Sequence, residues 1–304
     1  MRYHVVHKTG YAYNDMVPSC YNEIRLTPRQ TSRQTVVSHD LRITPPAAER
    51  HDRIDFFGND VTWLAIQEPH RQLHVHADSV VDVVAPPEAK DDMPWEQADD
   101  EIARRLDIEA LSARQHQFPS PFVPRDERLA EYARPSFASG RPLVAATLDL
   151  TLRICHDFTF DSGATTVGTP VLQVLEHRHG VCQDFAHLEI GCLRSLGIAA
   201  RYVSGYVVTR PPPGKPRLVG ADASHAWIAV FAPAIGWVDF DPTNGVIPSS
   251  EHLTLGWGRD FGDLSPVKGV MTGGRRHTLS YSVDIEAIPP EPVMRGAPGA
   301  AAVP

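Results

Sequence analysis

The stretch GVCQDFA, residues 180–186, puts a cysteine at the point where a helix is expected to begin. Apolar side chains follow at helical spacing as far as the stop signal Gly197, and they include Phe185, Ile190 and Leu193. The free amide groups and the positive end of the helix dipole favour the thiolate of Cys182, which is the nucleophilic form. A buried, inert cysteine is the other interpretation of this position.

The sequence predicts a second helix before this one and several strands after it. The earlier helix has Pro170 in its first turn, with Thr169 as candidate N-cap and Gly180 as its stop. Strands are expected over residues 200–208, 226–231, 237–241 and 277–288. A helix followed by strands indicates an α+β fold rather than a parallel doubly wound sheet.

Two polar side chains lie at the ends of an expected hairpin, because His225 opens one apolar strand and Asp241 closes the next. They share a sheet face if residue 231 pairs with 235 or residue 232 with 236, since side chains alternate along a strand. Asp241 could then orient His225 while the imidazole faces the Cys182 thiol, an arrangement that suits thiol acyl transfer. Taken singly, a histidine or aspartate at a strand end is more often a surface residue.

The domain organisation follows from length and turn signals. A chain of 304 residues is past the size at which a single core stops growing. Short expected strands between Gly, Pro and Asn/Asp turns predict an N-terminal β-sandwich over residues 1–85. A proline-rich linker over 86–95 precedes a catalytic core over 96–288, and the tail 289–304 is expected to be disordered. The proline-rich loop 209–220 is expected beside His225, as a rim or lid.

Composition and charge exclude several classes of protein. Hydrophobic residues make up 42% and charged residues 22%, as in folded globular proteins. The formal net charge is −8 and no Lys/Arg run occurs, so no nucleic-acid partner is expected. No apolar stretch is long enough for a membrane span and the first residues lack a signal-peptide pattern, so we expect no membrane partner and a cytoplasmic location. Four cysteines without CxxC spacing predict no disulfide framework.

Four ordered motifs together resemble the core of the transglutaminase-like superfamily. They are GVCQDFA at 180–186, LRSLGIAARYVSGY at 193–206, SHAW at 224–227 and GWVDFDPTN at 236–244. The β-rich first 85 residues resemble the N-terminal domain of bacterial members, and GRDF at 258–261 with the glycines 273–274 resembles their C-terminal signature. The resemblance implies a papain-like core, with the cysteine helix packed on an antiparallel sheet. It also implies Cys182 as nucleophile, His225 as base and then acid, and Asp241 as orienting group.

The predicted function is thiol-dependent acyl transfer on a peptide or side-chain amide, through an acyl-thioester. We expect hydrolysis by a cysteine peptidase or amidase, because water is abundant whereas a lysine amine is mostly protonated. The residues after the thiol are Gln183-Asp184, unlike the Cys-Trp of the animal crosslinking enzymes. Protein-glutamine amine transfer is the alternative. The expected partner is a peptide or protein substrate, with no cofactor and no metal.

Two further classes compete with this function. A zinc hydrolase is suggested by His177, His179, Cys182 and His187 within eleven residues, but no HExxH spacing occurs and the first two point to different sides of a helix. His74 and His76 share a strand face and could bind a metal, although a solvated face is the simpler interpretation. A non-enzymatic binding scaffold is disfavoured by the complete Cys–His–Asp set.

Other polar residues have structural interpretations. Cys20, Cys155 and Cys192 lack a histidine in comparable context and are interpreted as structural. Glu189 lies two turns after Cys182 on nearly the same helix face, so it could tune the thiol, serve as a buried structural carboxylate or pair with an arginine. Arg259 and Asp260 are expected to form an ion pair.

Overall fold

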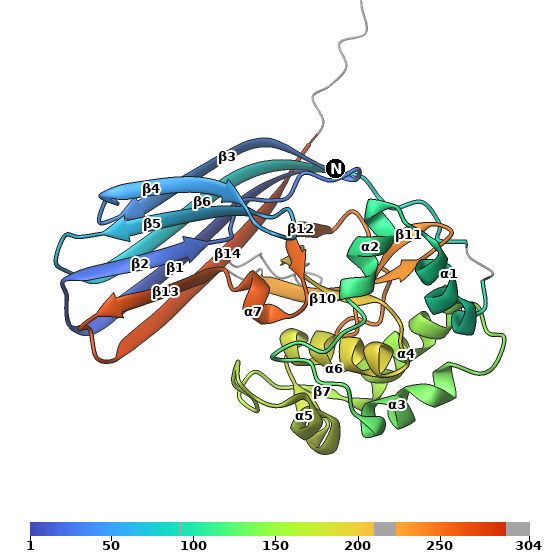
Figure 1. Cartoon of the computed structure of the whole chain (residues 1–304). Coiled ribbons are helices and arrows are strands. Elements are labelled where there is room, and N and C mark those ends of the chain that lie inside the picture. The colour runs from blue at the N-terminus through green and yellow to red at the C-terminus, as the bar shows by residue number, and fades with distance from the viewer. Residues whose placement is uncertain (91–92, 210–222, 290–304) are drawn as a thin grey trace, which may run out of the picture.

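The computed structural model describes residues 1–90, 93–209 and 223–289, and it shows a β-sandwich beside a core of helices and a sheet (Figure 1). The α+β class and the N-terminal sandwich are confirmed. Nearly all of the predicted loop 209–220 and of the predicted tail 289–304 lies outside the described residues. Among the described helices, none is long and apolar enough to cross a membrane.

The sandwich consists of two antiparallel four-stranded sheets. One has the order β14-β1-β6-β3, and the other has the order β13-β2-β5-β4. The strands from the N-terminal region are β1 (Arg2–Val17), β2 (Ser19–Ile24), β3 (Gln34–Thr44), β4 (Glu49–Ile54), β5 (Asp60–Ile66) and β6 (His70–Val83). Buried and exposed residues alternate along much of β6, so one face of its sheet contributes apolar side chains to the interior.

Two C-terminal strands complete this sandwich. β13 (Val267–Thr272) pairs with β2, and β14 (His277–Ile288) pairs with β1 over most of its length, so the red strands lie along the blue ones (Figure 1). The predicted boundary, which assigned everything from 96 to 288 to the catalytic core, differs from this pairing. Val283 and Ile285 are fully buried in the interior of the sandwich, and this burial holds β14 there.

The core places helices around a sheet with the order β11-β10-β9-β12. Its strands are β9 (Ala200–Val207), β10 (Ala223–Ala232), β11 (Gly236–Phe240) and β12 (His252–Gly258), and the short β7 (Thr159–Phe160) and β8 (His179–Gly180) pair separately. The helices are α1 (Ala98–Arg104), α2 (Ile108–Gln115), α3 (Glu127–Ala133), α4 (Leu143–Asp157), α5 (Val171–His177), α6 (Cys182–Ser195) and α7 (Phe261–Leu264), with 3-10 turns at Trp95–Gln97 and Arg134–Ser136. Helix α6 packs against β9 and β10, while α5 ends before Gly180 with Arg178 in the left-handed region.

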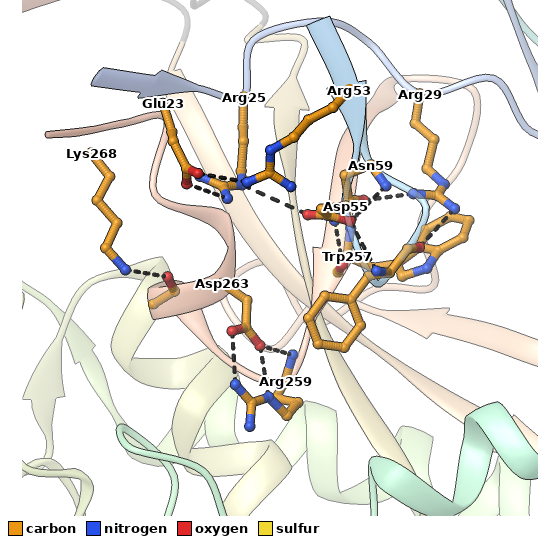
Figure 2. Close-up of polar contacts among 12 residues, drawn as sticks. Glu23, Arg25, Arg29, Arg53, Asp55, Asn59, Trp257, Arg259, Asp263 and Lys268 are labelled. Carbon is orange, nitrogen blue, oxygen red and sulfur yellow. Dashed lines mark hydrogen bonds and ion pairs between the residues drawn. The ribbon is translucent and has the colours of Figure 1, made fainter. Parts of the chain in front are cut away.

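The sandwich covers the edge strand β12 with two buried side-chain amides. Gln34 donates to the carbonyl of Thr254 at 2.7 Å and accepts from its N–H at 2.8 Å. Asn59 makes the same pair with the backbone of Trp257, at 2.9 and 3.0 Å, and Arg29 lies 3.6 Å over the Trp257 ring (Figure 2). Each amide replaces the hydrogen bonds of an absent neighbouring strand, so the free edge of the core sheet is satisfied by the sandwich.

Candidate functional site

Cys182 is the first residue of α6, as predicted, and its side chain is partly exposed. The helix begins here because the Asp184 carboxylate folds back and accepts the N–H of Val181 at 2.9 Å and the hydroxyl of Thr165 at 2.6 Å. Gly180 leaves room for that carboxylate, since a Cβ at this position would lie 2.9 Å from it. The thiol therefore lies beside the free amides of a helix start.

The hairpin of β10 and β11 brings His225 and Asp241 together. Ala232 pairs with Gly236, which is the second of the two predicted registers, and the imidazole and carboxylate become diagonal neighbours. Nε2 of His225 lies 2.8 Å from Oδ2 of Asp241, and both side chains are buried. Cys182 is within hydrogen-bonding reach of the same imidazole. Because Asp241 occupies Nε2, Nδ1 is the ring nitrogen left to face the thiol.

The charges of Asp241 and Cys182 determine the protonation state of the His225 imidazole. Burial lowers the pKa of this imidazole, but the hydrogen bonds and negative charges of Asp241 and Cys182 outweigh burial and raise the pKa to about 10. Burial raises the pKa of the Asp241 carboxyl, but its hydrogen bonds from imidazoles hold that pKa far below the ordinary range. The arrangement can hold an imidazolium between a carboxylate and a thiolate.

The Asp241 carboxylate accepts five hydrogen bonds. Oδ1 accepts the backbone N–H groups of Thr243 and Asn244, at 2.9 and 3.1 Å. Oδ2 accepts from the Asn244 amide at 2.7 Å and from Nε2 of His252 at 3.0 Å, besides His225. His252 was absent from the sequence-based candidates. The alternation in HLTLGWG, residues 252–258, is the signal that could have placed this histidine at the start of a buried strand.

The four residues of the competing zinc interpretation do not come together. His177 and His179 are exposed, whereas His187 is buried and accepts the N–H of Phe261 at 3.1 Å. Within the described residues, the group with metal-ligand spacing is His225, Asp241 and His252, whose candidate ligand atoms lie within 4.8 Å of one another. A metal ion there would take the nitrogen and oxygen atoms that now share protons, and so would compete with the link between His225 and Asp241.

Glu189 lies inside the core, on α6. Its side chain is fully buried, Oε1 accepts the hydroxyl of Thr151 at 2.6 Å, and Oε2 has no hydrogen-bond partner in the part of the chain that the structure describes. Burial raises its pKa to about 8, and the negative charge of Asp241 acts in the same direction. The interpretation as a buried carboxyl group is confirmed.

The remaining cysteines differ from Cys182 in their surroundings. Burial raises the thiol pKa of Cys20, Cys155 and Cys192, and Cys20 and Cys192 are closed off from solvent. All four cysteines are free. A raised pKa reduces the thiolate fraction, so these three sites are poorly suited to nucleophilic chemistry.

The expected Arg259–Asp260 ion pair is wrong. Arg259 pairs with Asp263, one helical turn onward, at 2.9 Å (Figure 2). Asp260 is instead the N-cap of α7, where its carboxylate accepts the N–H of Gly262 at 2.8 Å and that of Phe122 at 3.0 Å. Adjacent residues at a helix start point in different directions, so the N-cap role outcompetes the pair.

Family models match both parts of the chain. Residues 3–82 match the bacterial transglutaminase-like N-terminal region, and residues 131–242 match the transglutaminase-like superfamily. A crystal structure from Cytophaga hutchinsonii, designated a candidate cysteine protease, has a TM-score of 0.74 at 20% identity, over 96% of this chain and 92% of that chain. That likeness supports the same fold.

Curated proteins give the same family. An uncharacterized protein of Mycobacterium tuberculosis strain H37Rv is 42% identical over 294 residues, 93% of this chain and 92% of that protein. A protein-glutamine gamma-glutamyltransferase of Pseudomonas aeruginosa is 34% identical over 136 residues, 43% of this chain and 20% of that protein. The chain therefore belongs to the transglutaminase-like superfamily.

Proposed function

We propose that this protein hydrolyses an amide bond of a peptide or protein through an acyl-thioester on Cys182. His225 acts as base and then acid, and Asp241 orients the imidazole. The observation that carries this proposal is the buried His225 imidazole, bound to Asp241 on one side and within reach of a thiol at a helix start on the other.

The reaction follows from these positions. The Cys182 thiolate adds to the amide carbonyl carbon, while the Cys182 backbone N–H, free at the helix start, is the first donor to the developing oxyanion. His225 gives its proton to the amide nitrogen as the C–N bond breaks, which releases the amine and leaves the acyl-thioester. Water then attacks that carbonyl and gives a proton to His225. The C–S bond breaks, the carboxylic acid leaves, and the thiolate–imidazolium pair with which the reaction began is restored.

Hydrolysis is favoured over amine transfer by the surroundings of the thiol. Transfer requires a bound, deprotonated amine and protection of the thioester from water. Trp227 packs beside His225 with ring centroids 6.1 Å apart, but it is fully buried and leaves no exposed ring to cover a thioester. Trp257 lies between the guanidinium groups of Arg29 and Arg201 at the domain interface.

The test is product analysis by mass spectrometry. The protein is incubated with a peptide library, and the intact mass is measured for an acyl adduct that Cys182→Ala lacks. Hit peptides are then incubated with excess primary amine. Free acid as the dominant product supports hydrolysis, whereas a dominant amine adduct at saturating amine identifies a transglutaminase. The absence of turnover and of any Cys182 adduct across the library would contradict both activities.

A further inference from the structure

We infer that His252 is a positioning residue for Asp241, and that the N-terminal sandwich sets its position through β12. This inference rests on the proposed function, because it concerns how the orienting carboxylate is itself held. In the described part of the chain, His252 bonds to Asp241 and its ring lies beside that of His225, so its effect reaches the thiol through these two residues.

His252 differs from the other donors to Asp241 in where it comes from. Asn244 and Thr243 lie in the same turn as the carboxylate and therefore move with it. His225 is the group to be oriented. His252 comes from β12, at the opposite edge of the sheet from β11, and donates to the oxygen that His225 uses. It is therefore the donor that fixes Oδ2 relative to the rest of the sheet.

The glycine at position 205, in strand β9 between β10 and β12, leaves room for the ring that supports His252. Gly205 on β9 pairs with His225 on one side and with Thr254 on the other. A Cβ at Gly205 would lie 2.5 Å from the Trp227 ring, so the indole occupies the space that a side chain would fill. Trp227 packs edge-on against His252, with ring centroids 5.3 Å apart and an interplanar angle of 84°. The indole thus supports the His252 ring from the side.

The hydrogen bonds of His252 define its tautomer. Its Nε2 lies 3.0 Å from Asp241, whereas its buried Nδ1 has no hydrogen-bond partner among residues 1–90, 93–209 and 223–289. With the proton on Nε2, the ring donates to the carboxylate, and the unpartnered Nδ1 is a bare acceptor. A polar side chain that replaces His252 must therefore donate the same hydrogen bond to Asp241.

The sandwich holds the strand that carries this histidine. Thr254, two residues after His252, is bound by the Gln34 amide and by the backbone N–H of Arg29, at 3.0 Å. Gln34 is itself 3% exposed, so water does not compete freely for these bonds. A hydrogen-bonded path therefore runs from Gln34 through β12 and His252 to Asp241, and it gives the N-terminal domain a part in organising the site.

The experiment measures the rate of Cys182 alkylation by iodoacetamide from pH 5 to 9, together with kcat and KM on a hit peptide. His252→Phe keeps an aromatic ring but removes the donor, and His252→Gln restores a donor amide. We expect His252→Phe to slow alkylation and to lower kcat about tenfold with KM little changed, and His252→Gln to recover most of both rates. The alkylation pH profile should also move in the Phe variant and return in the Gln variant.

A matched control and a double mutant separate positioning from folding. His70 is another buried imidazole, bonded within the sandwich to the Glu68 carbonyl and the Cys20 thiol, so His70→Phe should lower stability without changing the alkylation profile. Gln34→Leu should slow alkylation two- to threefold, on the order of one weakened contact, and should add nothing in the His252→Phe background.

The outcomes distinguish this inference from the proposed function. If Asp241→Asn slows alkylation while His252→Phe matches the native protein, the positioning role is overturned and the triad stands. If His252→Gln is as slow as His252→Phe, or if His70→Phe shifts the profile equally, the effect is structural and the inference fails. If Asp241→Asn itself leaves Cys182 reactivity unchanged, the proposed function is the part that is wrong.

Discussion

Replacement of Glu189 by glutamine should make the protein more stable, by an amount that grows with pH. The carboxyl has an ordinary pKa of 4.5, and burial raises it to about 8 in the folded chain. Between these values the folded state holds a proton that the unfolded state has lost, so stability falls by about 1.4 kcal/mol per pH unit. The loss reaches about 5 kcal/mol above pH 8 and vanishes below pH 4.5. Glutamine has nearly the same shape, can still accept from Thr151, and does not titrate.

The assay is urea denaturation of the native protein and Glu189→Gln at pH 5, 6, 7 and 8, followed by tryptophan fluorescence. The difference in free energy of unfolding should grow in favour of the variant by about 3 kcal/mol between pH 5 and pH 7. Other titrating groups cancel in this difference. Glu131→Gln, at an exposed position on α3, is the matched control for removing one glutamate. A difference that stays constant from pH 5 to 8 would show that burial does not hold the Glu189 proton.

Three further predictions concern the thiol, the sheet and the carboxylate. Iodoacetamide should alkylate Cys182 before the other three cysteines at neutral pH, as followed by peptide mapping, and earlier labelling of another thiol would rule out this nucleophile. Gly205→Ala should destabilise the protein by about 3 kcal/mol, because the new Cβ would lie 2.0 Å from the Leu253 carbonyl oxygen, and an unchanged urea midpoint would contradict that contact. Asp241→Asn should retain more turnover than Cys182→Ala, and equal loss in both would mean that the carboxylate does more than orient.

Local patterns made the central hairpin predictable. Side chains alternate along β10 and β11, so a register with an even pairing sum, such as 231 with 235 or 232 with 236, places His225 and Asp241 on one face, and the structure has the second of these. The start of α6 at Cys182 was likewise predictable, because glycine before the thiol and apolar spacing after it are local signals. Both inferences used interactions within about twenty residues.

Long-range pairing was not predictable from one sequence. The alternation in 277–288 indicates a strand, but nothing in it specifies that β1, more than 260 residues earlier, is its partner. For the same reason the role of His252 could not be predicted, because its hydrogen bond to Asp241 joins residues from opposite edges of the sheet, with β9 and β10 between them. The ion-pair partner of Arg259 also depended on a local competition. The Asp260 carboxylate caps the start of α7, so Arg259 pairs with Asp263 instead.

The return of β13 and β14 to the sandwich has a consequence for how the chain folds during synthesis. Both sheets acquire an edge strand only when the last part of the described chain has left the ribosome, so the first domain begun is the last one finished. The core, inserted between β6 and β13, can complete its own sheet earlier, but Gln34 and Asn59 can hold the edge of β12 firmly only once the sandwich that carries them is complete. Nascent chains stalled before residue 267 should therefore expose unpaired strand edges and bind chaperones that recognise them.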